Sequence, residues 1–202
     1  MKLFNYLFIL IVMNMAAFTV NAQNNSGKKL FIDVHHLGAG KVTVADVAAA
    51  HAKDLAVQKK YGVTCISYWV DVANGDVYCL AAAPDAASFR KTHEEAHGLL
   101  PDEVYEVTAG PQAKMTSTAN LYLDIHRLGA GNVTAAAVAD AHKKDLAVQK
   151  KHGVNCVNYW VDEAKGIVIC LAEAADATDI IATHKEAHGL LPAEICKVVQ
   201  GQ

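Results

Sequence analysis

The sequence lacks an excess of charge of either sign. Its 18 Lys and Arg stand against 21 Asp and Glu, for a net charge of −3, and the basic residues form no long run. Both features argue against a nucleic-acid-binding protein and against a polybasic membrane-surface patch. Apolar residues make up 52% of the 202 residues, which excludes a wholly disordered chain. This length allows one or two domains.

The chain also lacks an uninterrupted apolar stretch of the length that spans a membrane. Its most apolar segment, residues 3–20, is interrupted by Asn5 and Asn14. A lysine precedes the segment, and a small-x-small sequence ends it at Ala22, with no cysteine nearby for lipid attachment. This order is typical of a secretory signal peptide. We therefore expect residues 1–22 to be cleaved and the mature protein to be periplasmic or secreted, with no membrane attachment.

Histidine and cysteine are abundant by comparison. The chain has 10 His, more than its Tyr, Phe or Trp, and 5 Cys. These two side chains bind borderline-soft metal ions, so the composition favours a metal-binding protein. Export permits disulfides, but an odd number of cysteines leaves at least one thiol without a partner in the chain.

Internal repetition is the strongest pattern in the sequence. Residues 29–107 align with residues 120–198 at a constant offset of 91, without a gap, and 49 of the 79 positions are identical. We expect a first repeat at 29–108, a Gly/Pro/Ser/Thr-containing linker at 109–119 and a second repeat at 120–199. Each unit is long enough to have its own core.

Each repeat has the pattern of a small α+β domain. Hydrophobic periodicity and turn residues predict strands at residues 30–37, 65–71, 76–83 and 103–107, and helices at 43–60 and 85–98. The βαββαβ order is typical of the ferredoxin-like fold. Such a unit leaves one sheet face bare, so two tandem units can pack their sheets together as an intramolecular pseudo-dimer.

Alternation along the strands predicts which side chains share a face. Asp33 and His35 lie on one face of the first strand. We expect this face to meet the other repeat, with Trp69 and Trp160 as large apolar anchors of the contact.

Four histidines recur at matched positions. They are His35, His51, His93 and His97 in the first repeat, and His126, His142, His184 and His188 in the second. His93 and His97 are four residues apart, so both imidazoles project from one helical face. His51 lies at a comparable depth on the neighbouring helix, which predicts a metal site between the helices. His35 indicates a second site between the repeats, and the sequence does not rank the two.

Other recurring residues offer weaker indications. Asp54, Glu95 and Glu103 are candidates for a carboxylate ligand or for orienting an imidazole, although a solvated face is the simpler interpretation of Asp54 and Glu95. The segment from His93 to His97 matches the His-Glu-x-x-His motif of zinc proteases. We do not favour this interpretation, because the second repeat has lysine at the position of the glutamate.

The recurring cysteines lie on the two strands of a predicted hairpin. If Asp71 pairs with Asp76, Cys65 lies opposite Ala82, and its thiol and that of Cys79 project from opposite faces. This register argues against a disulfide and favours small buried thiols. Whether Cys79 and Cys170 act as ligands stays open at this point, and Cys196 has no counterpart in the first repeat.

Several blocks of sequence resemble a family of small bacterial nickel-binding domains. These blocks are Asp33-Val34-His35, His51 to Ala56, Tyr68-Trp69-Val70-Asp71, Cys79-Leu80 and His93-x-x-Ala96-His97-Gly98. The resemblance implies a ferredoxin-like fold, dimerisation through the sheet and Ni(II) binding by the eight matched histidines. The chain departs from the family in its tandem duplication, its export signal, and Cys65 and Cys156.

Three functions remain to be distinguished. The first, which we favour, is an exported, non-enzymatic protein that binds Ni(II), with Zn(II) and Cu(II) as the other ions that suit imidazole ligands. The second is an enzyme acting on a small molecule inside a barrel lined by Asp33, His35 and Trp69, with His35 as the acid–base group. The third is a structural module that only self-associates. Oligomerisation beyond the pseudo-dimer stays open.

Overall fold

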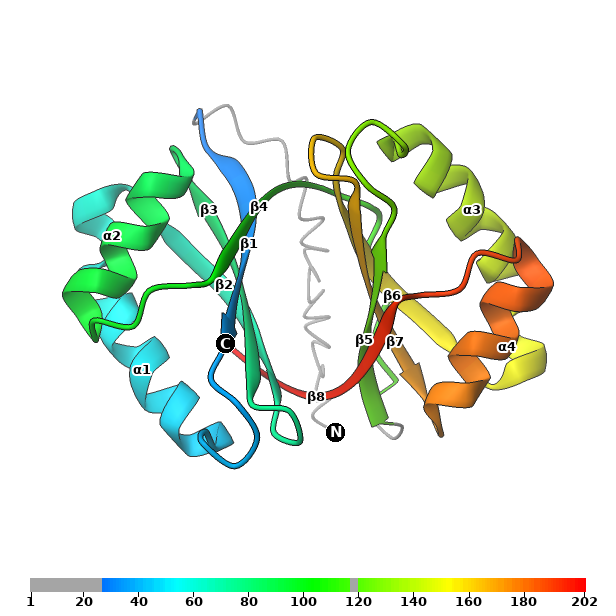
Figure 1. Ribbon diagram of the computed structural model, residues 1–202, viewed down its shortest axis with the longest axis horizontal. Coiled ribbons are helices and arrows are strands. Elements are labelled where there is room, and N and C mark those ends of the chain that lie inside the picture. The colour runs from blue at the N-terminus through cyan, green and yellow to red at the C-terminus, as the bar shows by residue number, and fades with distance from the viewer. Residues whose placement is uncertain (1–26, 117–119) are drawn as a thin grey trace, which may run out of the picture.

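The computed structural model of the chain describes residues 27–116 and 120–202, so the signal peptide predicted at residues 1–22 lies outside the described residues. Both repeats have the same element order (Figure 1). Repeat 1 contains β1 (Lys29–His36), α1 (Val44–Val57), η1 (Gln58–Tyr61), β2 (Thr64–Asp71), β3 (Asp76–Ala83), α2 (Ala86–Ala96) and β4 (Glu103–Ala109). Repeat 2 contains β5 (Asn120–Arg127), α3 (Ala135–Val148), η2 (Gln149–His152), β6 (Asn155–Asp162), β7 (Ile167–Ala174), α4 (Ala177–Ala187) and β8 (Glu194–Gly201).

Local side chains fix where the helices begin. Thr43 precedes α1 and accepts a hydrogen bond from the backbone N–H of Asp46, whose carboxylate in turn accepts from the Thr43 backbone N–H. This reciprocal capping box satisfies two donors that a helix start otherwise leaves unpaired. Asp85 caps α2 by accepting from the backbone N–H of Ser88 at 2.7 Å.

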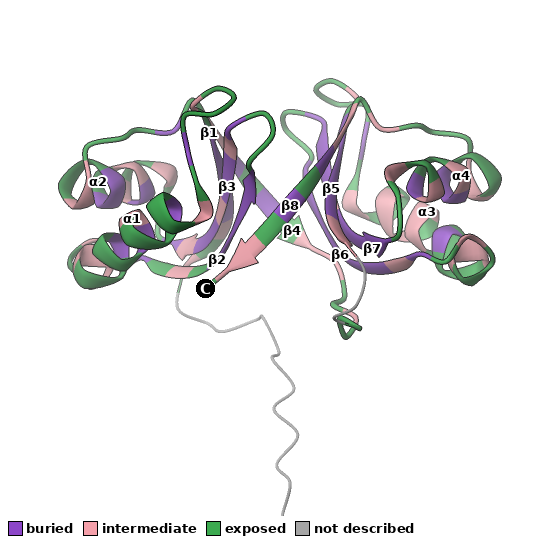
Figure 2. Ribbon diagram, turned by 90° about the horizontal axis from the view of Figure 1, so that it is seen from below, coloured by how far each residue is buried: buried purple, intermediate pink, exposed green. Residues whose placement is uncertain are grey.

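The eight described strands close into one barrel, in the order β1-β3-β2-β8-β5-β7-β6-β4. Within each repeat the strands pair as in a ferredoxin-like sheet. The last strand of each repeat also pairs with a strand of the other repeat: β4 pairs with β6, and β8 pairs with β2. Figure 2 shows β4 and β8 crossing between the two halves, with the helices outside. The predicted α+β fold of two βαββαβ units is therefore confirmed, and the units form a pseudo-dimer within one chain.

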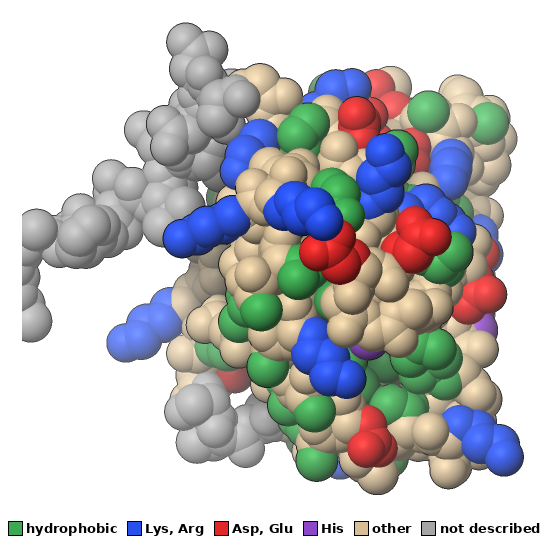
Figure 3. Space-filling view, turned by 90° about the vertical axis from the view of Figure 1, so that its left-hand side faces the viewer, with side chains coloured by type: hydrophobic (Ala, Val, Ile, Leu, Met, Phe, Trp, Pro, Cys, Tyr) green, Lys and Arg blue, Asp and Glu red, His purple; other side chains and the backbone are tan. Residues whose placement is uncertain are grey.

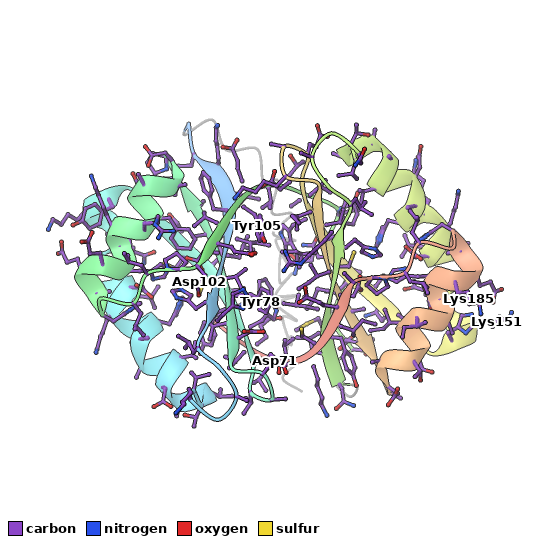
Figure 4. The ribbon with its side chains drawn as sticks, in the orientation of Figure 1. Asp71, Tyr78, Asp102, Tyr105, Lys151 and Lys185 are labelled. Carbon is purple, nitrogen blue, oxygen red and sulfur yellow. The ribbon has the colours of Figure 1, made fainter. Side chains whose placement is uncertain are left out.

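Apolar side chains fill the barrel between the two sheets. Trp69 and Trp160 meet there at a ring-centroid distance of 5.2 Å, as predicted. Tyr78 and Tyr105 belong to the same core, and Figure 4 shows both near the middle of the molecule. The other buried members are Ile32, Val34, Leu80, Val107, Leu123, Ile125, Val157, Ile167, Ile169, Leu171, Cys196 and Val198.

This core corrects the face assigned to the first strand. Ile32 and Val34 point into the barrel, so Asp33 and His35 point the other way, toward the helices. The prediction that Asp33 and His35 face the other repeat is wrong. The barrel interior is closed and apolar, whereas on the helix side His93 hydrogen bonds to Asp33 and its ring lies 5.3 Å from that of His35. The hypothesis of an enzyme site inside the barrel required Asp33 and His35 to line the interior, and neither does.

A β-bulge corrects the predicted cysteine geometry. Asp71 pairs with Asp76 as expected, but the register shifts between Cys65 and Ser67, so Cys65 pairs with Ala81. One inserted residue reverses the faces beyond it. Cys65 and Cys79 therefore lie on the same, helix-facing side and pack against one cluster. All five cysteines are free thiols.

The segment between the repeats lies along the barrel over its first part. Ala109 ends β4, and the backbone N–H groups of Gly110 and Ala113 donate to the carbonyls of Tyr159 and Val157 at 2.8 and 2.7 Å. Among the residues that the structure describes, no helix has both the length and the apolar character needed to cross a membrane.

Candidate metal centres

A buried histidine–carboxylate cluster lies between β1 and α2. Nε2 of His93 is 2.7 Å from Oδ2 of Asp33, and Nε2 of His35 is 3.7 Å from the other oxygen, Oδ1. Asp33, His35 and His93, here called the inner group, are all buried. Their donor atoms and Sγ of Cys79 lie within 4.8 Å of one another, close enough to share a metal ion.

A second cluster uses the other nitrogen of His93. Nδ1 lies 3.0 Å from Oδ1 of Asp54 on α1 and 3.2 Å from Nε2 of His97, which is 3.4 Å from the same Asp54 oxygen. We call Asp54, His93 and His97 the outer group. The two groups therefore share one imidazole, with one nitrogen facing each carboxylate.

Repeat 2 reproduces both groups. Oδ1 of Asp124 lies 3.2 Å from Nε2 of His126 and 3.3 Å from Nε2 of His184. Asp145, His184 and His188 form the second outer group. Two ligand atoms held about 2.1 Å from one ion, at right angles, are about 3.0 Å apart. The spacing of the inner group in repeat 2 is thus close to that of neighbouring metal ligands.

The charges within each cluster do not balance. Burial alone would lower the pKa of His93, but its hydrogen bonds to Asp33 and Asp54 outweigh burial and raise the pKa to about 10. Burial likewise opposes ionisation of Asp54, yet hydrogen bonds from His93 and His97 lower its pKa to about 2. Burial lowers the pKa of His35, which keeps that ring neutral. One positive charge therefore lies between two carboxylates.

An unpaired oxygen marks the same place in both repeats. Oδ1 of Asp33 and Oδ2 of Asp124 are buried and have no hydrogen-bond partner among the described residues. Leaving a buried carboxylate oxygen without a partner costs free energy, and a bound cation would remove that cost. Two buried histidine nitrogens and a free carboxylate oxygen are a donor set that fits a divalent transition-metal ion.

Hydrogen bonds distinguish the two groups as metal sites. The second nitrogen of a metal-bound imidazole normally donates to a carboxylate or carbonyl oxygen. His93 meets this requirement for the inner group, because Asp54 accepts from Nδ1. His97 does not: its Nδ1 accepts a hydrogen bond from the backbone N–H of Leu99 at 3.2 Å and therefore cannot donate to a carboxylate or carbonyl oxygen. The same bond recurs in repeat 2. By this criterion His93 fits as a ligand of the inner group, and His97 does not fit as a ligand of the outer group.

The remaining candidate ligands lie beside these groups. His51 is buried against Tyr68 at a ring-centroid distance of 4.8 Å and belongs to neither group, and His142 repeats this placement. Burial lowers the pKa of His51. Cys79 approaches the inner group, but burial raises its pKa well above the ordinary value, and a thiol is a poor ligand until it loses its proton.

The sequence pattern identified most of these residues as candidate ligands, but it gave the carboxylates too little weight. Asp33 was placed on the wrong face, and Asp54 was interpreted as solvated although it is buried. A signal for Asp54 was present, since it follows His51 by three residues and so shares its helical face. Glu95, by contrast, hydrogen bonds to Lys60 and Tyr61 at the surface, away from both groups.

The outer faces of the helices carry ordinary mixed charge. Figure 3 shows the helix side of repeat 1, where cationic and anionic side chains alternate with apolar ones and little histidine surface is visible. Glu94 and Lys185, the pair that distinguishes the two His-x-x-x-His segments, are both exposed. Lys185 lies at the outer edge of repeat 2 (Figure 4). An exposed glutamate away from the cluster gives no support to protease chemistry.

Comparisons with known proteins bear on both repeats. The family model described as nickel responsive protein SCO4226-like matches residues 31–107 and again residues 122–198. The crystal structure of SCO4226 from Streptomyces coelicolor A3(2) is 36% identical, and the match covers 42% of this chain and 99% of that one, with a TM-score of 0.36. An anthrone oxidase-like protein is 8% identical over 88% of this chain and 94% of its own, with a TM-score of 0.46. No curated protein matches the chain.

The family match thus covers most of each repeat, and the SCO4226 chain corresponds in length to a single repeat. The chain belongs to the nickel responsive protein SCO4226-like family, as a tandem pair of its domains in one polypeptide.

Proposed function

We propose that this protein is an exported metal-binding protein that holds one nickel ion in the inner group of each repeat. The observation that carries this proposal is that Asp33 and Asp124 each have one buried, unpaired oxygen and that each carboxylate lies close to two histidine nitrogens. A divalent ion bound by Asp33, His35 and His93 would replace the proton on Nε2 of His93. Two positive charges would then face the two carboxylates of the cluster, which removes its excess negative charge.

The family description supports nickel as the bound ion. Imidazole and carboxylate ligands also suit zinc and copper. In the proposed site the metal is the bound ligand of the protein, and no reaction is assigned to it. The chain's own residues would hold the ion in a buried position, since Asp33, His35 and His93 are all buried.

The test is a calorimetric titration of the metal-free mature chain, beginning at Gln23, with Ni²⁺, Zn²⁺ and Cu²⁺. We expect two nickel ions per chain with a Kd below about 10 μM. His93→Ala should remove one ion, and His93→Ala combined with His184→Ala should remove both. His36→Ala is the matched control, because His36 is an exposed histidine paired with Asp76 outside the cluster. Unchanged binding in the double variant would refute the site.

Export is proposed on the signal-peptide pattern alone and has its own test. Expression of the full chain in a bacterium, followed by cell fractionation and N-terminal sequencing, should yield periplasmic or extracellular protein that starts at Gln23. A cytoplasmic product that retains Met1 would refute export without affecting the metal site.

A further inference from the structure

A small cavity opens beside each histidine–carboxylate cluster, between the first helix of the repeat and its sheet. The cavity of repeat 1 has a volume of about 150 Å³ and that of repeat 2 about 130 Å³. The wall of the first includes the aliphatic side chains of Leu37, Val42, Val47, Ala50, Val77 and Leu99. The adjacent cluster also lines it, through His35, Asp54, Cys79, His93 and His97. Apolar cavities of about 150 Å³ hold a molecule the size of benzene.

The two cavities are more alike than the repeats that contain them. All fifteen lining positions of the first recur in the second at the offset of 91, and only two differ, with Lys41 and Asp46 replaced by Asn132 and Ala137. Five of these positions belong to the candidate metal groups or are the adjoining cysteine, and eight of the other ten are identical, compared with 49 of 79 over the whole repeat. Buried positions elsewhere differ between the repeats, as Phe89 and its counterpart Ile180 do. Packing requirements alone therefore do not explain why the two cavities are so similar.

A buried histidine supplies the polar end of each cavity. His51 is 7% exposed, lies against Tyr68 and lines the cavity, yet its imidazole makes no hydrogen bond to the described residues. His142 has the same placement in repeat 2. A ligand hydroxyl inside the cavity would give this imidazole the partner that it lacks.

Charge selects against an anionic ligand. Asp54 also lines the cavity, and the adjoining cluster has an excess negative charge, so a carboxylate would meet repulsion there. At the outer edge Lys41 and Asp46 have opposite charges, and their counterparts are both neutral.

We propose that each repeat binds one small, neutral aromatic molecule with a single hydroxyl group, of the size of phenol, in this cavity. The ring lies against the aliphatic wall and the hydroxyl reaches His51 or His142. This site adjoins the metal site proposed above, because His35 and His93 also line the cavity, but it does not require a bound metal ion.

The probe is 4-fluorophenol, observed by 19F NMR with the metal-free mature chain in the presence of a chelator. We expect two sites with Kd values of about 0.1–1 mM, in the range of a ligand with eight non-hydrogen atoms. Fluorobenzene should bind about 2- to 10-fold more weakly, the usual contribution of one hydrogen bond. 4-Fluorobenzoate should bind more weakly still. Tighter binding of the benzoate, or no binding of 4-fluorophenol at 10 mM, would overturn the proposal.

Cavity-filling variants test the location. Ala50→Leu should reduce the number of 4-fluorophenol sites from two to one, and adding Ala141→Leu should leave none. Ala49→Leu is the control, since Ala49 is exposed on the same helix and does not line the cavity. His51→Leu with His142→Leu should abolish the preference for 4-fluorophenol over fluorobenzene while both still bind.

Nickel titration of the Ala50→Leu/Ala141→Leu variant separates the two proposals. Two nickel ions should still bind with unchanged affinity, because neither alanine belongs to the inner group. If both filled cavities still bind 4-fluorophenol as the unmodified chain does, the proposed site is wrong whatever the nickel result.

Discussion

Nε2 of His93 lies 2.7 Å from Oδ2 of Asp33, with the histidine side chain 2% exposed and the aspartate 0% exposed. His93 reaches this carboxylate from α2, while its other nitrogen faces Asp54 on α1. One imidazole therefore links both helices to the sheet and belongs to both candidate metal groups. The same relationship between His184, Asp124 and Asp145 recurs in repeat 2.

The histidines should differ in their importance for nickel binding. His93→Ala should weaken nickel binding in repeat 1 by more than about 100-fold, and His35→Ala by about 10- to 100-fold, because both are proposed ligands. His97→Ala should have less than a 10-fold effect, since the Leu99 N–H occupies Nδ1 of its ring. Each variant is compared by calorimetry in a chain that also has His184→Ala, so that only repeat 1 is measured. A larger loss for His97→Ala than for His35→Ala would favour the outer group.

His93 and His184 should stay protonated in the metal-free protein at alkaline pH. Their pKa values of about 10 lie above the ordinary 6.5, so protonation of these rings stabilises the folded state. This stabilisation is fully present below about pH 6.5 and is lost as the pH rises through 10. Histidine-selective 15N NMR at pH 8.5 should show two imidazolium rings. Neutral rings at both positions would contradict the double hydrogen bonding to aspartate.

The fold was predictable from the sequence where local patterns decide it. Alignment of the chain with itself at an offset of 91 predicted both repeats. Thr43 and Asp85, predicted to begin the helices, cap them in the structure. The exchange of β4 and β8 between repeats was not predictable, because the pairing of two edge strands depends on the relative placement of the sheets. The bulge after Cys65 was missed for a related reason: no glycine or proline marks it.

The candidate site was predictable in its histidines and not in its carboxylates. A charged residue such as Asp33 is seldom fully buried, so a sequence pattern alone gives it little weight. Its burial follows from the apolar residues on either side of it, Ile32 and Val34, which fill the barrel and turn Asp33 toward His93.

Closure of the barrel should depend on two glycines at equivalent positions. A Cβ at Gly110 would overlap the ring of Tyr159, and a Cβ at Gly201 would overlap the ring of Tyr68. Gly110→Ala should lower the free energy of unfolding by about 1–3 kcal/mol. Gly201→Ala should lower it as well, because a Cβ there would lie 2.1 Å from the Tyr68 ring. Urea unfolding followed by tryptophan fluorescence measures both, and no loss for Gly110→Ala would argue against this close approach.

The five thiols should be unreactive in the folded protein. Burial raises the pKa of Cys65, Cys156 and Cys196 to about 12, and it raises the pKa of Cys79 and Cys170 well above the ordinary value. Since the thiolate is the reactive form, alkylation by iodoacetamide at pH 8 should be at least about 100-fold slower than in the unfolded chain. Mass spectrometry should then count five additions after unfolding. Rapid labelling of any native thiol would contradict the described burial.

Anomalous diffraction at the nickel absorption edge would locate the bound metal ion in each repeat. Crystals of the nickel-loaded mature chain should show one peak per repeat, within about 2.3 Å of Nε2 of His93 and His184 and in contact with Asp33 and Asp124. Peaks confined to the exposed His36, or to the Nδ1 side of His93 next to His97, would contradict the assignment of the inner group as the metal centre.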